Sequence, residues 1–243
     1  MRFSVDAHAI GRHLTGNEVY VRNLLNGFAT LDQTSEFIAY LSEEKAASEV
    51  PKRFRCHAVA SNPFVRLGYD LRSRLKEDRP DLVHVQYTAP LGCPVPIVVS
   101  VHDVSFLEHP EFFPWARARQ LKITVRRTIR RAARVLTPSE FSKQAIVKAY
   151  GLAEDRIEVV PNAVSSEFRP RSRETAMGHI QSNYDIPSPF ILTVGDLQPR
   201  KNLIGLIRAL PNCSATIPIC PTTWCWSASG AGTAHGRTGW PSV

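Results

Sequence analysis

Long apolar runs are what this sequence of 243 residues most clearly lacks. A short strand-like run at its start is followed directly by the carboxylate of Asp6, which excludes the apolar stretch of a secretory signal. No window approaches the ~18 consecutive apolar residues of a membrane-spanning helix. We therefore expect a cytoplasmic protein in which Cys56 and Cys93 remain reduced thiols.

Charge is nearly missing from the last part of the chain. Between Leu210 and Val243 the one side chain with a full charge is Arg237, and every other charged residue lies before this stretch. Three of the five cysteines and three of the four tryptophans also follow Ala209. Natural surfaces are rarely so poor in charge, which sets residues 210–243 apart from the rest.

A shifted reading register explains this change of composition. Codons compatible with residues 209–231, read one base out of register, give FAQLLRDHPDLPHHLVLVGKRGW after the codon of Ala209. That string continues the apolar periodicity of the helix predicted from Leu203 onward, then supplies a turn and the strand LVLVG. We expect residues 210–243 to be an out-of-frame tail produced by loss of one base near codon 209. A genuine terminus of unusual composition is the alternative.

What the chain does contain is a regular alternation of apolar runs and helical patterns. Uninterrupted runs such as Ile97-Val98-Val99 suit strands that are covered on both faces. The fold class is therefore α/β, with a mainly parallel, Rossmann-like sheet. The predicted strands are residues 3–5, 37–41, 54–59, 82–85, 97–101, 135–137, 157–160 and 190–194.

A proline-rich break at residues 185–189 indicates a domain boundary. We expect residues 1–185 to form an N-terminal domain. Residues 186–209 would then supply the first strand and helix of a second Rossmann-like domain. That domain is incomplete before the composition changes, because a domain needs ~50 residues.

Residues that follow the strands are candidate ligands, because open parallel sheets bind ligands at the carboxyl ends of their strands. Gly16 and Asn17 stand at a helix start, whose free N–H groups suit a phosphate or a sugar hydroxyl, although Asn17 could simply cap the helix. His102 could bond a sugar, share a proton or be structural. Asp103 could orient His102, bind a hydroxyl or cap a turn.

A pair of cations, Arg200 and Lys201, stands beside the helix start that follows strand 190–194. Two cations and a set of N–H groups could hold a diphosphate there, or the pair could be merely solvated. Neither Asp-x-Asp nor paired-histidine spacing is present near these candidates, so we expect no metal.

A strongly basic segment spans residues 115–134, whose charge equals the net charge of +8 of the whole chain. Leu121, Val125, Ile129 and Ala133 make an apolar stripe at helical spacing, which leaves the other face cationic. A solvated helix is one interpretation, and contact with an anionic membrane surface or a lipid-linked diphosphate is another. Nucleic acid is disfavoured, since no recognised binding motif accompanies the charge. The basic residues are Arg117, Arg119, Lys122, Arg126, Arg127, Arg130, Arg131 and Arg134.

Taken together, the loops resemble the family 4 retaining glycosyltransferases, which have the GT-B architecture of two Rossmann-like domains. The resemblance covers residues 1–209, and the order and spacing of its segments are more specific than any one of them. The segments are Asp6, Thr15-Gly16, Tyr20 and Asn23-Leu24-Leu25; Val101-His102-Asp103-Val104-Ser105-Phe106 and His109-Pro110-Glu111; Leu136-Thr137-Pro138-Ser139-Glu140-Phe141-Ser142; Tyr150-Gly151, Arg156-Ile157 and Val159-Val160-Pro161-Asn162-Ala163-Val164; and Val194-Gly195-Asp196-Leu197-Gln198-Pro199-Arg200-Lys201-Asn202-Leu203.

The resemblance implies transfer of a hexose, often mannose, from a nucleotide-diphosphate sugar to a glycan or lipid-linked acceptor, without metal or cofactor. It implies that Lys201 and Arg200 bind the diphosphate and that His102 lines the cleft near the reacting sugar. Gly16 and Asn17 would lie against donor or acceptor. Such an enzyme would be cytoplasmic or peripheral to the inner face of the membrane.

Two departures from the family pattern matter. Asp196 stands where many relatives have an arginine, and the paired glutamates of the second domain have no counterpart. We therefore expect this chain not to turn over sugar nucleotides at a useful rate. A non-catalytic module that binds a glycan or membrane is the alternative, and an enzyme such as an epimerase, which acts on sugar nucleotides without an acceptor, is a third reading.

Overall fold

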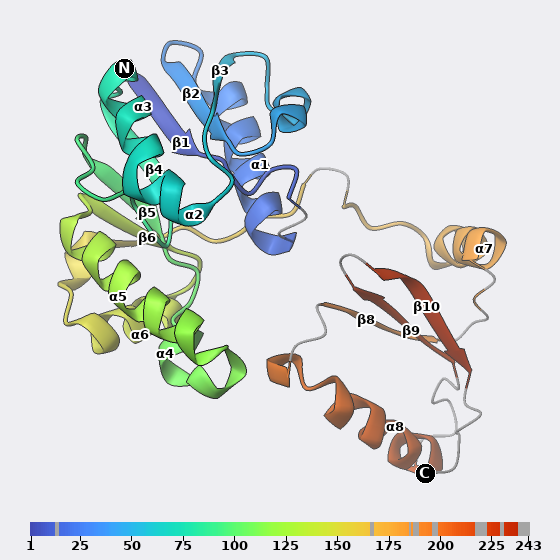
Figure 1. Ribbon diagram of the computed structural model, residues 1–243. Coiled ribbons are helices and arrows are strands. Elements are labelled where there is room, and N and C mark those ends of the chain that lie inside the picture. The colour runs from blue at the N-terminus through green and yellow to red at the C-terminus, as the bar shows by residue number, and fades with distance from the viewer. Residues whose placement is uncertain are drawn as a thin grey trace. The chain divides into compact units, whose positions relative to one another are not determined.

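The computed structural model divides the chain into two compact units, Met1–Ala163 and Val164–Val243 (Figure 1). It describes residues 1–12, 15–165, 168–184, 186, 190–195, 199–216, 223–228 and 231–237. The domain limits expected from the sequence, at residues 185 and 209, stay predictions.

The first unit is built on a seven-stranded sheet in the order β3-β2-β1-β4-β5-β6-β7. Every neighbouring pair of strands in this sheet is parallel. This topology confirms the expected α/β, Rossmann-like class, and all seven strands predicted before residue 163 are present. They are β1 (Arg2–Asp6), β2 (Glu36–Leu41), β3 (Phe54–Ala58), β4 (Leu82–Gln86), β5 (Ile97–Ser100), β6 (Arg134–Thr137) and β7 (Ile157–Val159).

Helical segments connect most of these strands, as is usual for parallel pairing, whereas residues 87–96 join β4 to β5 without a helix. The α-helices are α1 (Thr15–Leu31), α2 (Pro63–Val65), α3 (Leu71–Asp78), α4 (Ser105–Glu108), α5 (Trp115–Arg131) and α6 (Glu140–Tyr150). Shorter turns are the 3₁₀ segments η1 (Glu44–Glu49), η3 (Pro110–Phe112) and η4 (Glu154–Arg156) and the π-helical segment η2 (Arg66–Asp70).

Strand β2 shows why the apolar runs of this sequence are uninterrupted. Phe37, Ala39 and Leu41 belong to a core cluster that includes residues of α1, whereas Ile38 and Tyr40 belong to a cluster with α3. Successive side chains of a strand point to opposite faces, so both faces of β2 are covered by helices. Figure 1 shows α1 and α3 on the two sides of these strands.

Helix α6 is capped at both ends by the residues that its sequence provides. The hydroxyl of Ser139 accepts a hydrogen bond from the backbone N–H of Ser142, and Gly151 ends the helix with φ of 61°. The hydroxyl of Ser142 donates to the backbone carbonyl of His102 at 3.0 Å. The start of α6 is thus tied to the loop after β5.

The second unit contains α7 (Arg173–Tyr184), β8 (Phe190–Val194), η5 (Pro199–Lys201), α8 (Leu203–Thr216), β9 (Thr223–Ala228) and β10 (Ala231–Arg237). Strand β8 pairs in parallel with β9, and β9 pairs antiparallel with β10. The predicted strand 190–194 and the helix after it are therefore confirmed. None of the helices in the described part of the chain is long and apolar enough to cross a bilayer.

Two isoleucines of α5 provide a matched test of this packing. Ile129 is fully buried in the core, whereas Ile123 is 60% exposed on the same helix. Ile129→Ala should lower the free energy of unfolding by about 2–5 kcal/mol, because it leaves a cavity. Ile123→Ala should change it by less than about 0.5 kcal/mol. Denaturant titration followed by circular dichroism measures both, and equal losses would contradict the assigned orientation of α5.

Candidate active site

Polar side chains gather around a small hollow at the carboxyl edge of the sheet. The residues around it lie at or just after the ends of β5, β6 and β7, and one of them lies on α1. Thr137, the last residue of β6, is 3% exposed, and its hydroxyl has no hydrogen-bond partner in the described part of the chain. The residues around the hollow are Tyr20, Ser100, His102, Leu136, Thr137, Pro138, Val160 and Asn162.

The hydroxyl of Ser100 connects two aromatic side chains beneath this hollow. It lies 2.7 Å from the hydroxyl of Tyr20 and 2.8 Å from Nε2 of His84. Burial, helped by the nearby His102, lowers the pKa of His84 to about 4. The His84 ring is therefore neutral near pH 7, and its Nδ1 has no hydrogen-bond partner among the described residues.

Gln86, at the end of β4, fixes the tautomer of His102. Its Nε2 donates to the backbone carbonyl of Asn17 at 3.4 Å, and its Oε1 lies 3.3 Å from Nε2 of His102. A carbonyl can only accept, so the amide nitrogen faces Asn17 and the amide oxygen faces the histidine. Nε2 of His102 must then carry the proton, which leaves Nδ1 with the lone pair.

The ring of His102 is held between two tyrosines. Its centroid lies 4.6 Å from that of Tyr20 and 5.7 Å from that of Tyr87, both in edge-on geometry. Burial lowers the pKa of His102, and the opposing effect of Asp103 is smaller. The site thus presents a neutral imidazole with a fixed hydrogen-bonding pattern, which can accept a hydrogen bond from a hydroxyl.

Asp103 is engaged in a turn and makes no ion pair with His102. Its Oδ1 accepts from the backbone N–H of Ser105 at 3.0 Å and from the Ser105 hydroxyl at 2.6 Å. The sequence left three roles open for Asp103, and in the structure its carboxylate caps a turn. Its substrate-binding role stays a prediction.

Gly16 and Asn17 lie in the first turn of α1, and both are exposed. Apart from its chain neighbours and the backbone of its own helix, no described atom lies within 4 Å of the position that a Cβ at Gly16 would take. This side of the helix start is open space, and packing does not require the glycine.

Arg200 and Lys201 lie in η5, directly before α8, and both are exposed. They belong to the second unit, whereas His102 belongs to the first. Their assignment to a diphosphate stays a prediction. Asp196 lies outside the described residues.

A second polar cluster lies at the end of β1. Oδ1 of Asp6 is 3.1 Å from Nδ1 of His8, and Oδ2 is 3.7 Å from Nε of Arg66. Burial opposes ionisation of Asp6, but His8 and Arg66 together hold its pKa at about 2. Arg66 is only 5% exposed, and nothing in its sequence context marks it as buried.

Several residues of the site were not among the sequence-derived candidates, namely Tyr20, Gln86, Ser100, Thr137 and Asn162. Three of them, Gln86, Ser100 and Thr137, are the last residues of β4, β5 and β6. Their signal in the sequence is their place at the ends of predicted strands, since open parallel sheets bind ligands at the carboxyl ends of their strands. The described residues contain no cluster of three or more His, Cys, Asp or Glu side chains that could hold a metal.

The pKa of His84 predicts how stability depends on pH. The unfolded chain protonates this ring near pH 6.5, but the folded chain does so only near pH 4, so the unfolded state binds more protons between these values. Stability should therefore fall as the pH is lowered, by about 2 kcal/mol between pH 7 and pH 5. His84→Gln should remove most of this dependence in denaturant titrations at the two pH values.

His109→Gln is the matched control, because His109 is exposed and paired with Glu111 at the surface. It should keep the pH dependence of the parent chain. An unchanged pH dependence in His84→Gln would contradict the assignment of His84 as a neutral buried ring.

Known proteins are similar to the part of this chain that forms the candidate site. The model of the family described as Glycosyltransferase Family 4 matches residues 14–168, from the start of α1 to just beyond β7. The O-antigen chain mannosyltransferase B of Escherichia coli is 31% identical over 112 residues, which are 46% of this chain and 29% of that protein.

Two solved structures share the fold. The Anabaena protein Alr3699/HepE, in complex with UDP and glucose, superposes with a TM-score of 0.55 at 17% identity, over 87% of this chain and 57% of that one. MnaA of S. aureus, bound to UDP, gives 0.57 at 13% identity, over 95% and 62%.

The chain therefore spans less than two thirds of the length of these relatives. Because the family match includes α1, the strands β4 to β7 and the loop that holds His102, it covers the whole candidate site. By this match over well over half of its residues, the chain belongs to glycosyltransferase family 4.

Proposed function

We propose that the first unit is the acceptor-side half of a retaining glycosyltransferase. The reaction would move a hexose from a nucleotide-diphosphate sugar to a glycan or a lipid-linked acceptor. The observation that carries this proposal is the neutral His102, which Gln86 orients at the carboxyl edge of the sheet. The 31% identity to an O-antigen mannosyltransferase supports mannose as the sugar.

In such a transfer, the bond between the anomeric carbon and the diphosphate oxygen breaks, and a bond to an acceptor hydroxyl oxygen forms. The hydroxyl proton leaves with the diphosphate. Negative charge grows on the departing group, and fixed cations stabilise it, a role that we assign to Lys201 and Arg200. Nδ1 of His102 would accept a hydrogen bond from a sugar hydroxyl and so position the reacting carbon.

We further propose that residues 210–243 are translated in a shifted register. The near absence of charge and the concentration of Trp and Cys after Ala209 support this reading. Little turnover is expected from residues 1–243 by themselves, because these residues do not include the paired glutamates of the family.

Sequencing the DNA through codon 209 tests the shift directly. A register compatible with FAQLLRDHPDL and an open frame beyond it, with the paired glutamates, are expected. A coding sequence that cannot yield that string in the neighbouring register would overturn the shift.

A transfer assay tests the site. The protein with the register restored should transfer mannose from its nucleotide-diphosphate form to bacterial membrane extracts, and residues 1–243 should not. In the restored protein, His102→Ala should lower kcat/KM by about a hundredfold. His109→Ala, at an exposed histidine, is the matched control and should leave it unchanged.

Three results of this assay decide between readings. Transfer by residues 1–243 alone would refute the expected loss of activity. Full activity of His102→Ala would refute the role of His102. Binding of glycan by the restored protein without any transfer would favour the non-catalytic module, which the compactness of unit Met1–Ala163 also allows.

A further inference from the structure

Helix α5 presents one face to solvent on which cations and apolar side chains are interleaved. Positions 115, 119, 122, 126 and 130 are spaced by three or four residues and so lie on one side of a helix, with position 123 beside them. All six side chains are exposed, Trp115 at 77% and Ile123 at 60%. We call this set the cationic face of α5; its members are Trp115, Arg119, Lys122, Ile123, Arg126 and Arg130.

The charges of this face are not neutralised within the first unit. Among residues 1–12 and 15–163, none of the ion pairs involves Arg119, Lys122, Arg126 or Arg130. The nearest acidic residues in sequence are Glu111 on the N-terminal side, which is paired with His109, and Glu140 on the C-terminal side. These four cations, spread over about 17 Å of helix, therefore face water without an ion-pair partner among the described residues of the first unit.

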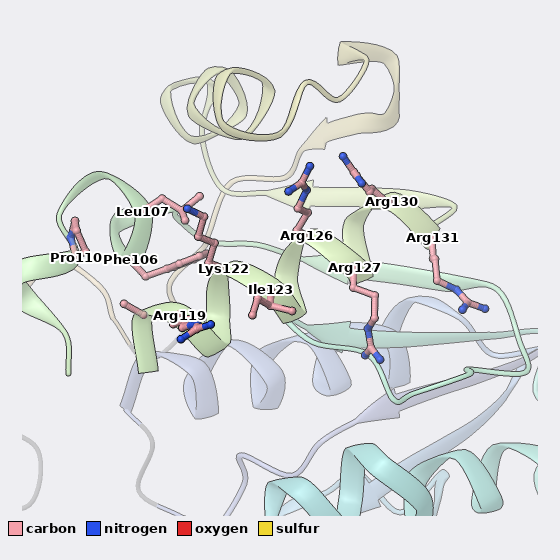
Figure 2. Close-up of a pocket in the computed structure, with 11 residues that line it drawn as sticks. Phe106, Leu107, Pro110, Arg119, Lys122, Ile123, Arg126, Arg127, Arg130 and Arg131 are labelled. Carbon is pink, nitrogen blue, oxygen red and sulfur yellow. The ribbon is translucent and has the colours of Figure 1, made fainter. Parts of the chain in front are cut away.

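The cationic face borders a hollow of about 970 Å³ between α5 and the α4–η3 segment. Phe106, Leu107 and Pro110 contribute apolar surface to it, and Arg119, Lys122 and Arg126 stand at its edge. Figure 2 shows Arg126 and Arg130 pointing to the same side of α5 from successive turns. Exposed apolar groups and unpaired cations thus occupy the same surface.

We propose that the cationic face of α5 binds an anionic lipid bilayer, with the helix lying in the plane of the headgroups. The four cations would contact lipid phosphates, while Trp115 and Ile123 would enter the boundary between headgroups and acyl chains. This binding does not depend on the transfer reaction, because it needs neither His102 nor the second unit.

A bilayer accounts for this face better than a nucleic acid does. A polyanion alone explains the cations, but it leaves Ile123 exposed to water, and an aliphatic side chain cannot stack on a base as an aromatic ring does. A bilayer surface satisfies both kinds of group. Tryptophan is also the residue that is enriched at the membrane–water interface.

Vesicle sedimentation of the full 243-residue chain tests the proposal. The chain should bind vesicles of equal parts phosphatidylcholine and phosphatidylglycerol, and it should bind phosphatidylcholine alone much more weakly. Replacing Arg119, Lys122, Arg126 and Arg130 by Gln should lower the partition coefficient by roughly a hundredfold or more. Glutamine has a helix propensity similar to that of lysine and arginine, so α5 should persist, which circular dichroism checks.

The matched control replaces four exposed cations elsewhere on the first unit, Lys45, Lys52, Arg55 and Lys76, by Gln. It removes the same net charge and should lower binding far less. A separate variant, Trp115→Ala with Ile123→Ala, keeps every charge and should weaken binding to the anionic vesicles by roughly tenfold.

Salt gives a readout that needs no variant. Raising the ionic strength from about 0.1 M to about 1 M shortens the Debye length from ~10 Å to ~3 Å and should release the chain from anionic vesicles.

Equal loss of binding in the α5 and control variants would overturn the proposal, as would equal binding to neutral and anionic vesicles. Binding of a short RNA duplex that survives Trp115→Ala with Ile123→Ala, together with no vesicle binding, would assign the face to nucleic acid instead.

Discussion

Parallel strand register is the constraint on which the candidate site depends. Gln86 pairs with Ser100 across β4 and β5, and Ser100 pairs with Leu136 across β5 and β6. Because these strands run in the same direction, their last residues meet at one edge, and the loop that follows β5 carries His102 to the same place. Slipping β5 by one residue would turn Ser100 to the opposite face of the sheet, away from Tyr20 and His84.

The hydroxyls of Tyr20 and Ser100 and the rings of His84 and His102 are uncharged, so this part of the edge is polar without a buried charge. Ser100 has one proton to donate and lone pairs to accept, so it can serve both Tyr20 and His84 without a buried charge. Keeping His84 and His102 neutral avoids placing two imidazolium ions close together in a poorly solvated site. The opposite solution is found on α5, where charge is abundant and all of its cations except the half-buried Arg127 are exposed to water.

The fold was largely predictable from the sequence, because a parallel sheet covered on both faces leaves a strong local signal. The run Ile97-Val98-Val99 and the alternation of helical patterns located the strands within a residue or two. The site was only partly predictable. His102 was found because it directly follows an apolar run, but its partner Gln86 and the hydroxyl of Ser100 are ordinary residues until three-dimensional pairing brings them together. Asp103 is the opposite case: it directly follows His102 in the sequence, but its carboxylate accepts hydrogen bonds from Ser105 within a short turn.

The amide of Gln86 makes the proton on His102 depend on a backbone carbonyl 69 residues away from Gln86 in the chain. With the Asn17 carbonyl in reach, the amide has one favourable orientation. If α1 moved away, that orientation would lose its preference, the amide could rotate by half a turn, and the imidazole would exchange its donor and acceptor atoms. The position of the start of α1 therefore determines which nitrogen of His102 carries the proton. A ligand that displaced this helix start would change whether Nδ1 of His102 accepts or donates a hydrogen bond.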